Sequence, residues 1–254
     1  MAQAAETVQL KEATLDAFAE YIREAEAGMD RTLHEEGAFL WSDGDAERAQ
    51  KIRKGDTVAQ FWSGTRPVTV PDGLVHDWIG ATIIPGATVA QTLALIQDYD
   101  NHKNIYKPEV IDSKLISRRG NDFQIFLRLL KKKIITVVLD TDHDVHYSQP
   151  AAGRWCCRSY TTRIAEVEDA GTPQEKVLAR DTGYGFLWRL YSYWRLQERD
   201  GAVFAECRAI SLTRDVPLGL GWIMEPIIRK LPRESLINTL ESTRRGVAGA
   251  TKCC

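Results

Sequence analysis

The 254-residue chain has no apolar run of the 18 or so residues that a membrane-spanning helix needs. Its first residues, MAQAAETVQLK, contain no apolar signal region either. Two interpretations of this start remain open: a chain made without a signal peptide, or one from which a signal peptide was removed and a start methionine added. We therefore expect a soluble protein without stable membrane insertion, cytoplasmic in the first case and periplasmic in the second.

Net charge is also nearly absent, because 33 basic residues face 35 acidic ones. A net charge of −2 gives no electrostatic reason to expect nucleic acid or an anionic membrane as partner. The only basic run, Lys131–Lys133, lies between two apolar runs, and we expect it to be a solvated strand end.

Cysteine is scarce and odd in number, which excludes a disulfide framework. The five cysteines are Cys156, Cys157, Cys207, Cys253 and Cys254. The terminal Cys-Cys resembles a doubly prenylated tail, but no polybasic run precedes it. We expect residues 250–254 to be a disordered tail.

Motifs for phosphate loops, dinucleotide-binding glycines, nucleophile elbows and zinc-protease helices are missing. His143 and His146 are three residues apart, which on a strand places them on opposite faces and not as a chelating pair. We therefore expect no metal and no cofactor, although scattered Arg, Tyr, His and Asp residues leave catalysis possible.

The string Asp140-Thr-Asp142-His-Asp144 resembles the start of a calcium loop. The sixth position of that loop would be Val145 instead of glycine, and the twelfth would be Ala151 instead of glutamate. We expect these acids to lie on one solvent-facing side of a strand.

What the sequence does contain is a clear β-hairpin at residues 193–212. Asp200-Gly201 between alternating side chains is typical of a two-residue turn with positive φ at both positions. This turn predicts the pairs Arg199–Ala202, Arg195–Glu206, Trp194–Cys207 and Tyr193–Arg208. One face then carries small side chains around one indole: Ser192, Trp194, Leu196, Val203, Ala205, Cys207, Ala209 and Ser211. Another part of the protein must cover this face.

The N-terminal third predicts one helix and a connecting segment. Residues 11–35 place apolar side chains at helical steps, at Leu15, Phe18, Ile22, Ala25, Met29 and Leu33. This amphipathic helix must dock on the rest of the chain. The segment from Trp41 to Pro71 shows no stable period, and we expect a connection with one short strand.

From Gly73 onward the pattern predicts one strand, one helix, a run of strands and a last helix. Thr88 and Gln91 form a capping box that opens the first of these helices, with Val89, Thr92, Leu93 and Ile96 on its buried side. The predicted strands are 75–84, 110–117, 123–130, 134–142, 154–167, 186–198 and 203–212. Short connections favour an antiparallel meander.

The last helix is expected to begin near Pro232, which fits a first turn. Leu236, Ile237, Leu240 and Val247 then follow on one side. About sixteen residues give a helix roughly 24 Å long, enough to lie across a sheet.

This layout resembles that of the helix-grip superfamily, which includes START-type lipid-binding domains and polyketide aromatase/cyclases. Two stretches carry the resemblance: Asp98-Tyr-Asp100 through Tyr106-Lys-Pro-Glu-Val-Ile-Asp-Ser113, and Gly219-Leu-Gly-Trp222 running into Pro232-Arg-Glu-Ser235. It implies an α+β fold in which a curved antiparallel sheet wraps around a long C-terminal helix. It covers residues 73–249 and leaves residues 1–72 as an N-terminal helical extension.

The resemblance also implies a cavity for an apolar ligand between the sheet and the last helix. The small-residue face of the hairpin would line it, although Leu236, Ile237 and Leu240 could instead fill the space as ordinary core. The candidate ligand-binding residues are Trp194, Leu196, Ala205, Cys207, Ala209, Arg128 and Tyr106. Arg128 interrupts an apolar strand and could hold a polar head group, or it could face the surface.

Three functions follow from this sequence. The first is a binding or carrier protein for a lipid, sterol-like or polyketide-like molecule. The second is a cyclase/dehydrase-type enzyme with an acid or base such as His143, Tyr160 or Asp112 in the same cavity. The third is an interaction module whose N-terminal helix leaves its own domain to bind a partner.

Overall fold

The computed structural model describes residues 7–33, 39–62, 64–132, 136–215 and 221–251, with the backbone alone for residues 221–230, 250 and 251. Several residues named in the sequence analysis lie outside the described residues: 1–6, Lys133 of the basic run, Ile134 at the start of a predicted strand, Gly219-Leu220, and Cys253-Cys254. The expectations placed on them stay predictions.

A single large antiparallel sheet forms the centre of the protein, in the order β2-β4-β12-β11-β8-β7-β6-β5, with β3 and β9 pairing at its margins. The strands are β2 (Val58–Phe61), β3 (Val68–Val70), β4 (Gly73–Pro85), β5 (Val110–Arg119), β6 (Asp122–Lys132), β7 (Thr136–Ala151), β8 (Arg154–Glu168), β9 (Lys176–Val177), β11 (Arg189–Arg199) and β12 (Ala202–Arg214). A separate pair joins β1 (Val8–Gln9) to β10 (Thr182–Gly183). The predicted antiparallel meander is confirmed.

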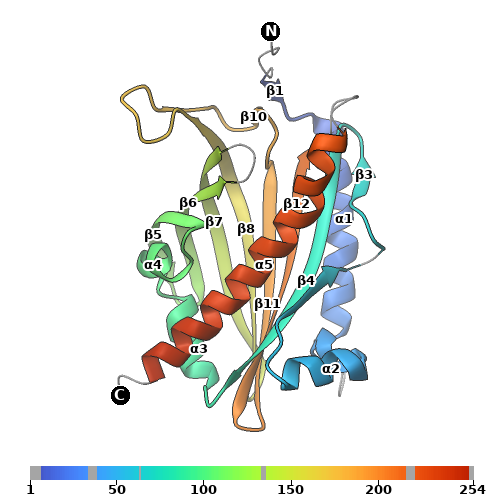
Figure 1. Ribbon diagram of the computed structural model, residues 1–254, viewed down its shortest axis with the longest axis vertical. Helices are drawn as coiled ribbons and strands as arrows, with labels where there is room; N and C mark the ends of the chain where they lie inside the picture. The colour runs from blue at the N-terminus through green and yellow to red at the C-terminus, as the bar shows by residue number, and fades with distance from the viewer. Residues whose placement is uncertain (1–6, 34–38, 63, 133–135, 216–220, 252–254) are drawn as a thin grey trace.

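The helices lie on both faces of this sheet. They are α1 (Glu12–Arg31), α2 (Ala46–Arg53), α3 (Val89–Ile96), α4 (His102–Ile105) and α5 (Gly221–Thr251), with 3-10 helices η1 (Trp41–Gly44) and η2 (Tyr99–Asn101). α5 crosses one face on a diagonal, and α1 lies behind β4 and β12 (Figure 1). We call the face under α5 the inner face and the face under α1 the outer face. The expected α+β fold is confirmed.

The predicted hairpin is confirmed in turn and register. Asp200 and Gly201 have φ of 54° and 68°, and Arg199, Arg195, Trp194 and Tyr193 pair with the expected partners. Since side chains alternate along a strand, Trp194 and Cys207 face α5 while Tyr193 and Arg208 face α1.

Two predictions about helices were incomplete. α5 begins at Gly221, so Pro232 lies inside it and not in its first turn. The contacts that α5 makes with β4 and α3 support this longer helix despite the backbone hydrogen bond that a proline cannot donate.

The segment from Trp41 to Pro71 contains α2, opened by Asp45, whose side chain accepts from the Arg48 N–H at 2.7 Å. That capped start was present in the sequence and was missed. The Thr88–Gln91 capping box is confirmed.

α5 can approach the sheet closely because β4 carries a glycine beneath it. A Cβ on Gly80 would lie 2.8 Å from Leu240 Cδ1 and 2.9 Å from the Val58 carbonyl oxygen. Leu236 and Leu240 are both buried against Trp78 and Cys207 at this crossing. Gly80 therefore sets the distance between helix and sheet, and with it the room left elsewhere between them.

Replacing Gly80 is expected to push α5 away from the sheet. We expect Gly80→Ala to lower the free energy of unfolding by about 1 to 3 kcal/mol, the usual cost of overpacking. Urea unfolding measures the change. Gly249→Ala is the matched control, because nothing lies within 4 Å of a Cβ at that position of α5. A Gly80→Ala variant as stable as the wild type would contradict the close contact.

The N-terminal segment packs on the outer face and adds β2 and β3 to the sheet edge beyond β4. Phe18 and Ile22 of α1 are buried against Tyr193 and Ile210. α2 buries Ile52 against a neighbouring part of the same face. The division of the chain at residue 72 into extension and main domain stays a prediction.

Candidate ligand-binding cavity

A cavity of about 600 Å³ lies between the inner face and α5. This volume falls within the range of roughly 300 to 1,000 Å³ that is usual for small-molecule sites. Most of its lining is apolar: Ile96, Val110, Ile125, Leu127, Leu129, Val137, Leu139, Val145, Leu187, Leu190, Leu231 and Leu236. An apolar molecule would therefore meet compatible walls on both the sheet and the helix side.

The hairpin face divides into a cavity half and a core half. Trp194, Cys207 and Ala209 line the cavity. Leu196 and Ala205, which were also expected to line it, lie outside its lining and belong to a core cluster that includes Val247 of α5. The reason is that α3 and the last turns of α5 cover the turn end of the hairpin. The expected filling of this space by Leu236, Ile237 and Leu240 is not what covers Leu196 and Ala205, because α3 and Val247 do so instead.

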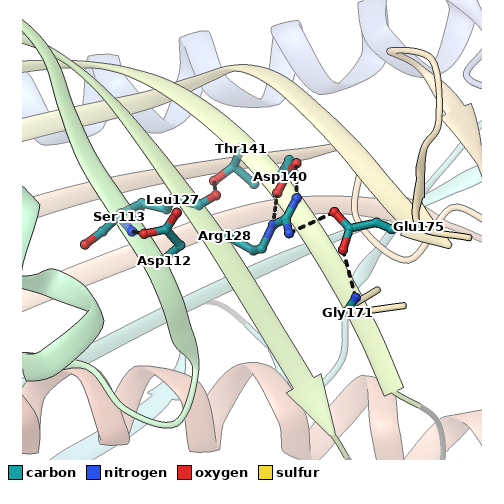
Figure 2. Close-up of polar contacts among 8 residues, drawn as sticks. All are labelled: Asp112, Ser113, Leu127, Arg128, Asp140, Thr141, Gly171 and Glu175. Carbon is teal, nitrogen blue, oxygen red and sulfur yellow. Dashed lines mark hydrogen bonds and ion pairs between the residues drawn. The ribbon is translucent and has the colours of Figure 1, made fainter. Parts of the chain in front are cut away.

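Arg128 lies on the outer face and does not line the cavity. Its guanidinium donates to both carboxylate oxygens of Asp140, at 2.7 and 2.9 Å, and to Glu175 at 3.0 Å (Figure 2). Since Leu127 and Leu129 face inward, alternation turns Arg128 outward. Asp140 is buried by this pairing, which corrects the expectation that it faces solvent.

Of the other candidates, Tyr106 and His143 line the cavity and two do not. The Tyr106 hydroxyl lies 3.1 Å from Thr243 Oγ1 on α5, and burial raises its pKa to about 12. Tyr160 is on the outer face, where its hydroxyl donates to Glu26 of α1 at 2.6 Å. Asp112 pairs with Lys103 at 3.1 Å, and that hydrogen bond lowers the pKa of its carboxyl.

Three histidines line the cavity, and sequence reasoning singled out only His143. Burial lowers the pKa of His76, His102 and His143 to about 4 each, so all three are neutral at neutral pH. His143 Nε2 lies 2.9 Å from Thr141 Oγ1, and its Nδ1 lies 3.3 Å from Ser159 Oγ. His102 Nε2 lies 3.1 Å from the Ile96 carbonyl oxygen.

One end of the cavity is closed by a pair of tyrosines. The hydroxyls of Tyr99 and Tyr147 lie 2.7 Å apart, and Cys157 lies beside Tyr147. Burial raises the pKa of both phenols and raises that of the Cys157 thiol to about 12. These groups are neutral and satisfy one another, so this end favours an apolar part of a ligand.

A partly buried ion pair joins the edge of the sheet to α5. Lys131 pairs with Glu109 and donates to Ser235 Oγ at 2.6 Å, while Asn238 Nδ2 donates to Glu109 at 3.2 Å. Lys131 was expected to be solvated; its ammonium instead lies against α5, because the sheet brings the end of β6 beneath that helix. No sequence pattern indicated this contact.

In the part of the chain that the structure describes, no group of three or more His, Cys, Asp or Glu side chains is placed to hold a metal ion. His143 is buried and His146 is exposed, on opposite faces as expected. None of the described helices is both long and apolar enough to cross a membrane.

The sheet order and the long helix across its inner face determine the kind of fold. The chain has the expected helix-grip layout, an antiparallel sheet packed against one long C-terminal helix. No protein-family model matches the sequence, and no curated protein matches it either.

Several solved structures are similar to this chain at low identity. A STAR-related lipid transfer protein from Xanthomonas axonopodis shares 14% identity over 71% of this chain and 96% of its own, with a TM-score of 0.49. Human STARD10 shares 11% over 87% of each chain, with a TM-score of 0.47. The Zhui aromatase/cyclase from Streptomyces sp. R1128 shares 11% over 68% and 94%, with a TM-score of 0.42. Similarity at this level carries no argument about ligand or activity.

Removing the Trp194 indole is expected to weaken uptake of an apolar probe into the helix-grip cavity. Trp194 lies between Cys157 and Cys207 in the sheet, with its side chain on the cavity wall. Losing its contact area would cost at least about 1.5 kcal/mol, roughly a tenfold loss of affinity. Titration with the neutral dye N-phenyl-1-naphthylamine measures this change for Trp194→Ala. The control is Trp62→Ala on the exposed outer side; unchanged binding and stability in Trp194→Ala would contradict the assignment.

Proposed function

We propose that this protein binds and carries an apolar small molecule of the lipid, sterol-like or polyketide-like kind. The observation that supports the proposal is the cavity of about 600 Å³ with a mostly apolar wall surface. Burying about twenty methylenes offers about 16 kcal/mol at roughly 0.8 kcal/mol each. The cost of association is about 4 to 15 kcal/mol. Useful affinity therefore needs few hydrogen bonds.

The proposed contact residues are those of the expected set that line the cavity: Trp194, Cys207, Ala209 and Tyr106. Ile125, Leu129, Val145 and Leu236 complete the apolar surface. The proposal has no role for nucleic acid.

Native mass spectrometry of the freshly purified protein tests this function, followed by organic extraction of whatever is released. We expect an apolar molecule at near-unit occupancy. The matched control is Ala209→Phe, which places a ring in the cavity and should abolish the bound mass while the fold is retained. An apo mass together with no uptake of any apolar probe would overturn the proposal.

A second function, a cyclase/dehydrase-type enzyme, is favoured by one observation. His143 lies in the cavity wall as a neutral imidazole between two hydroxyl groups. A neutral imidazole can accept a proton from a carbon next to a keto group, as the first step of an aldol-type ring closure. Conversion of a linear poly-β-keto thioester mimic by the wild type, and its loss in His143→Phe with binding retained, would establish this function.

A further inference from the structure

Two buried polar atoms in the cavity wall have no hydrogen-bond partner. They are His76 Nδ1 and Trp78 Nε1, and no other residue of the described cavity lining has such an atom. Only 2% of His76 and 5% of Trp78 is exposed. An unpaired buried polar atom destabilises the folded state, so a native cavity wall with two of them needs an explanation.

The two nitrogens have opposite hydrogen-bonding roles. Trp78 Nε1 carries a hydrogen and can only donate. His76 Nε2 lies 3.0 Å from Thr213 Oγ1, whose own proton is donated to the Arg214 carbonyl oxygen at 3.2 Å. The Thr213 oxygen therefore accepts from His76 Nε2–H. In a neutral imidazole this leaves Nδ1 as the acceptor.

The position of the two residues allows one ligand group to reach both. His76 and Trp78 are two residues apart on the inner face of β4, which separates their Cα atoms by about 6.6 Å. The two side chains therefore project from the same face, and a single oxygen on which they converge can lie about 3 Å from each nitrogen. Opposite them on β12 are Ser211 and Ala209, whose small side chains also line the cavity and leave room there.

The other cavity histidines provide a comparison within the same wall. Both ring nitrogens of His143 have hydroxyl groups within hydrogen-bond distance, and His102 Nε2 has the Ile96 carbonyl oxygen. Tyr99 and Tyr147 satisfy each other. The unmet hydrogen-bonding capacity of this wall is therefore concentrated at His76 and Trp78.

We propose that His76 and Trp78 form a subsite for a ligand hydroxyl group. The hydroxyl would donate to His76 Nδ1 and accept from Trp78 Nε1–H. A carboxylate only accepts hydrogen bonds, so it would leave His76 Nδ1 without a donor. An alkyl end neither donates nor accepts, so it would leave both nitrogens unpaired. The inference rests on the proposed function and narrows it: the ligand class is a neutral apolar alcohol, with its hydroxyl at β4 and its apolar part toward Tyr99 and Tyr147.

Three probes of matched length test the subsite: 1-tetradecanol donates and accepts, 1-methoxytridecane only accepts, and pentadecane does neither. Their affinities are measured by displacement of N-phenyl-1-naphthylamine from the wild type and from Trp78→Phe, His76→Phe and His143→Phe. The affinity of one probe is compared between two proteins, so the free energy of hydration of the unbound probe is the same in both measurements and cancels. Circular dichroism and dye affinity establish that each variant is folded.

Each lost hydrogen bond is expected to weaken binding about three- to tenfold. Trp78→Phe should lower the affinity for the alcohol and for the ether but not for pentadecane. His76→Phe should lower the affinity for the alcohol alone. His143→Phe should leave the relative affinities of the three probes unchanged. Equal effects on all three probes in Trp78→Phe and His76→Phe, or the same selectivity change in His143→Phe, would overturn the subsite. Failure of the wild type to bind either the dye or any of the three probes would instead overturn the proposed function.

Discussion

Acid is expected to unfold this protein between pH 6.5 and pH 4. Burial lowers the pKa of His76, His102 and His143 from 6.5 to about 4, so the unfolded chain binds up to three more protons than the folded one in this window. Stability from this source is complete above pH 6.5 and is lost as the pH falls toward 4. Each histidine contributes about 3 kcal/mol, and the three together about 10 kcal/mol. That is comparable with the whole stability of a typical domain, about 5 to 15 kcal/mol.

Two buried carboxyl groups act in the opposite direction. Burial raises the pKa of Glu166 and Glu206, so the folded state gains protons there as the pH falls below the raised values. The three histidines alone would make the free energy of unfolding change by at most about 4 kcal/mol per pH unit. The two carboxyl groups make the observed slope smaller than this.

Urea unfolding at pH 8, 7, 6, 5.5 and 5 measures this dependence. His143→Phe should reduce the slope by close to one proton, because its imidazole can no longer take one up on unfolding. His146→Gln, at the exposed surface, controls for the loss of an imidazole as such. A free energy of unfolding that stays flat from pH 7 to pH 4.5 would contradict buried, neutral histidines.

Deleting Lys11–Leu33 is expected to abolish cooperative folding. The deletion exposes the surface that Phe18 and Ile22 bury, at about 1.5 to 3 kcal/mol for each side chain. It also removes Glu26, which accepts from the hydroxyls of Tyr160 and Tyr193 at 2.6 and 2.9 Å. Hydrogen bonds and buried contacts together account for much of the stability of a domain.

A buried ion pair makes this surface costly to uncover. Arg208 donates to both oxygens of Asp77, at 2.9 and 2.6 Å, and the Tyr21 hydroxyl of α1 donates to Asp77 at 2.7 Å. Arg195 donates to the Met29 carbonyl oxygen of α1 at 2.7 Å. Without α1, these groups lose partners that the sheet does not replace.

Circular dichroism and thermal unfolding of the deletion variant decide between a docked helix and a mobile one. Phe18→Ala is the milder test, with an expected loss of about 3 to 5 kcal/mol. Glu24→Ala, at an exposed position of the same helix, is the control. A deletion variant as stable as the full chain would favour the interaction-module hypothesis, in which α1 leaves to bind a partner.

Patterns confined to a few neighbouring residues were predicted well. The Asp200-Gly201 turn has a local steric cause, and its register assigned each hairpin side chain to the correct face. The Thr88–Gln91 capping box is equally local and is present. α1 was predicted from its apolar period, with Phe18 and Ile22 on its buried side. The α2 start at Asp45 has the same local character and was overlooked.

Residues whose role depends on distant neighbours were predicted poorly. The alternation of Leu127, Arg128 and Leu129 could have predicted that Arg128 faces outward. Its partner Glu175 comes from a distant loop and could not be predicted from local sequence. Leu196 and Ala205 share a face with Trp194, yet α3 and Val247 cover them and leave Trp194 on the cavity. His76 and His102 lie in a strand and a short helix that no motif connects, and only their burial beside the cavity marks them.

The sequence by itself determined the order of the main elements from Gly73 onward, the register of the last hairpin and the amphipathic face of α1. These follow from steric preferences and periodicity within single segments. Only the tertiary structure decided where the space under α5 is filled and where it stays open. That outcome depends on the Gly80 contact with Leu240, on the cover from α3, and on the pairing of Lys131 with Glu109. Each of these three contacts joins segments that are distant in sequence, so local sequence patterns do not predict them.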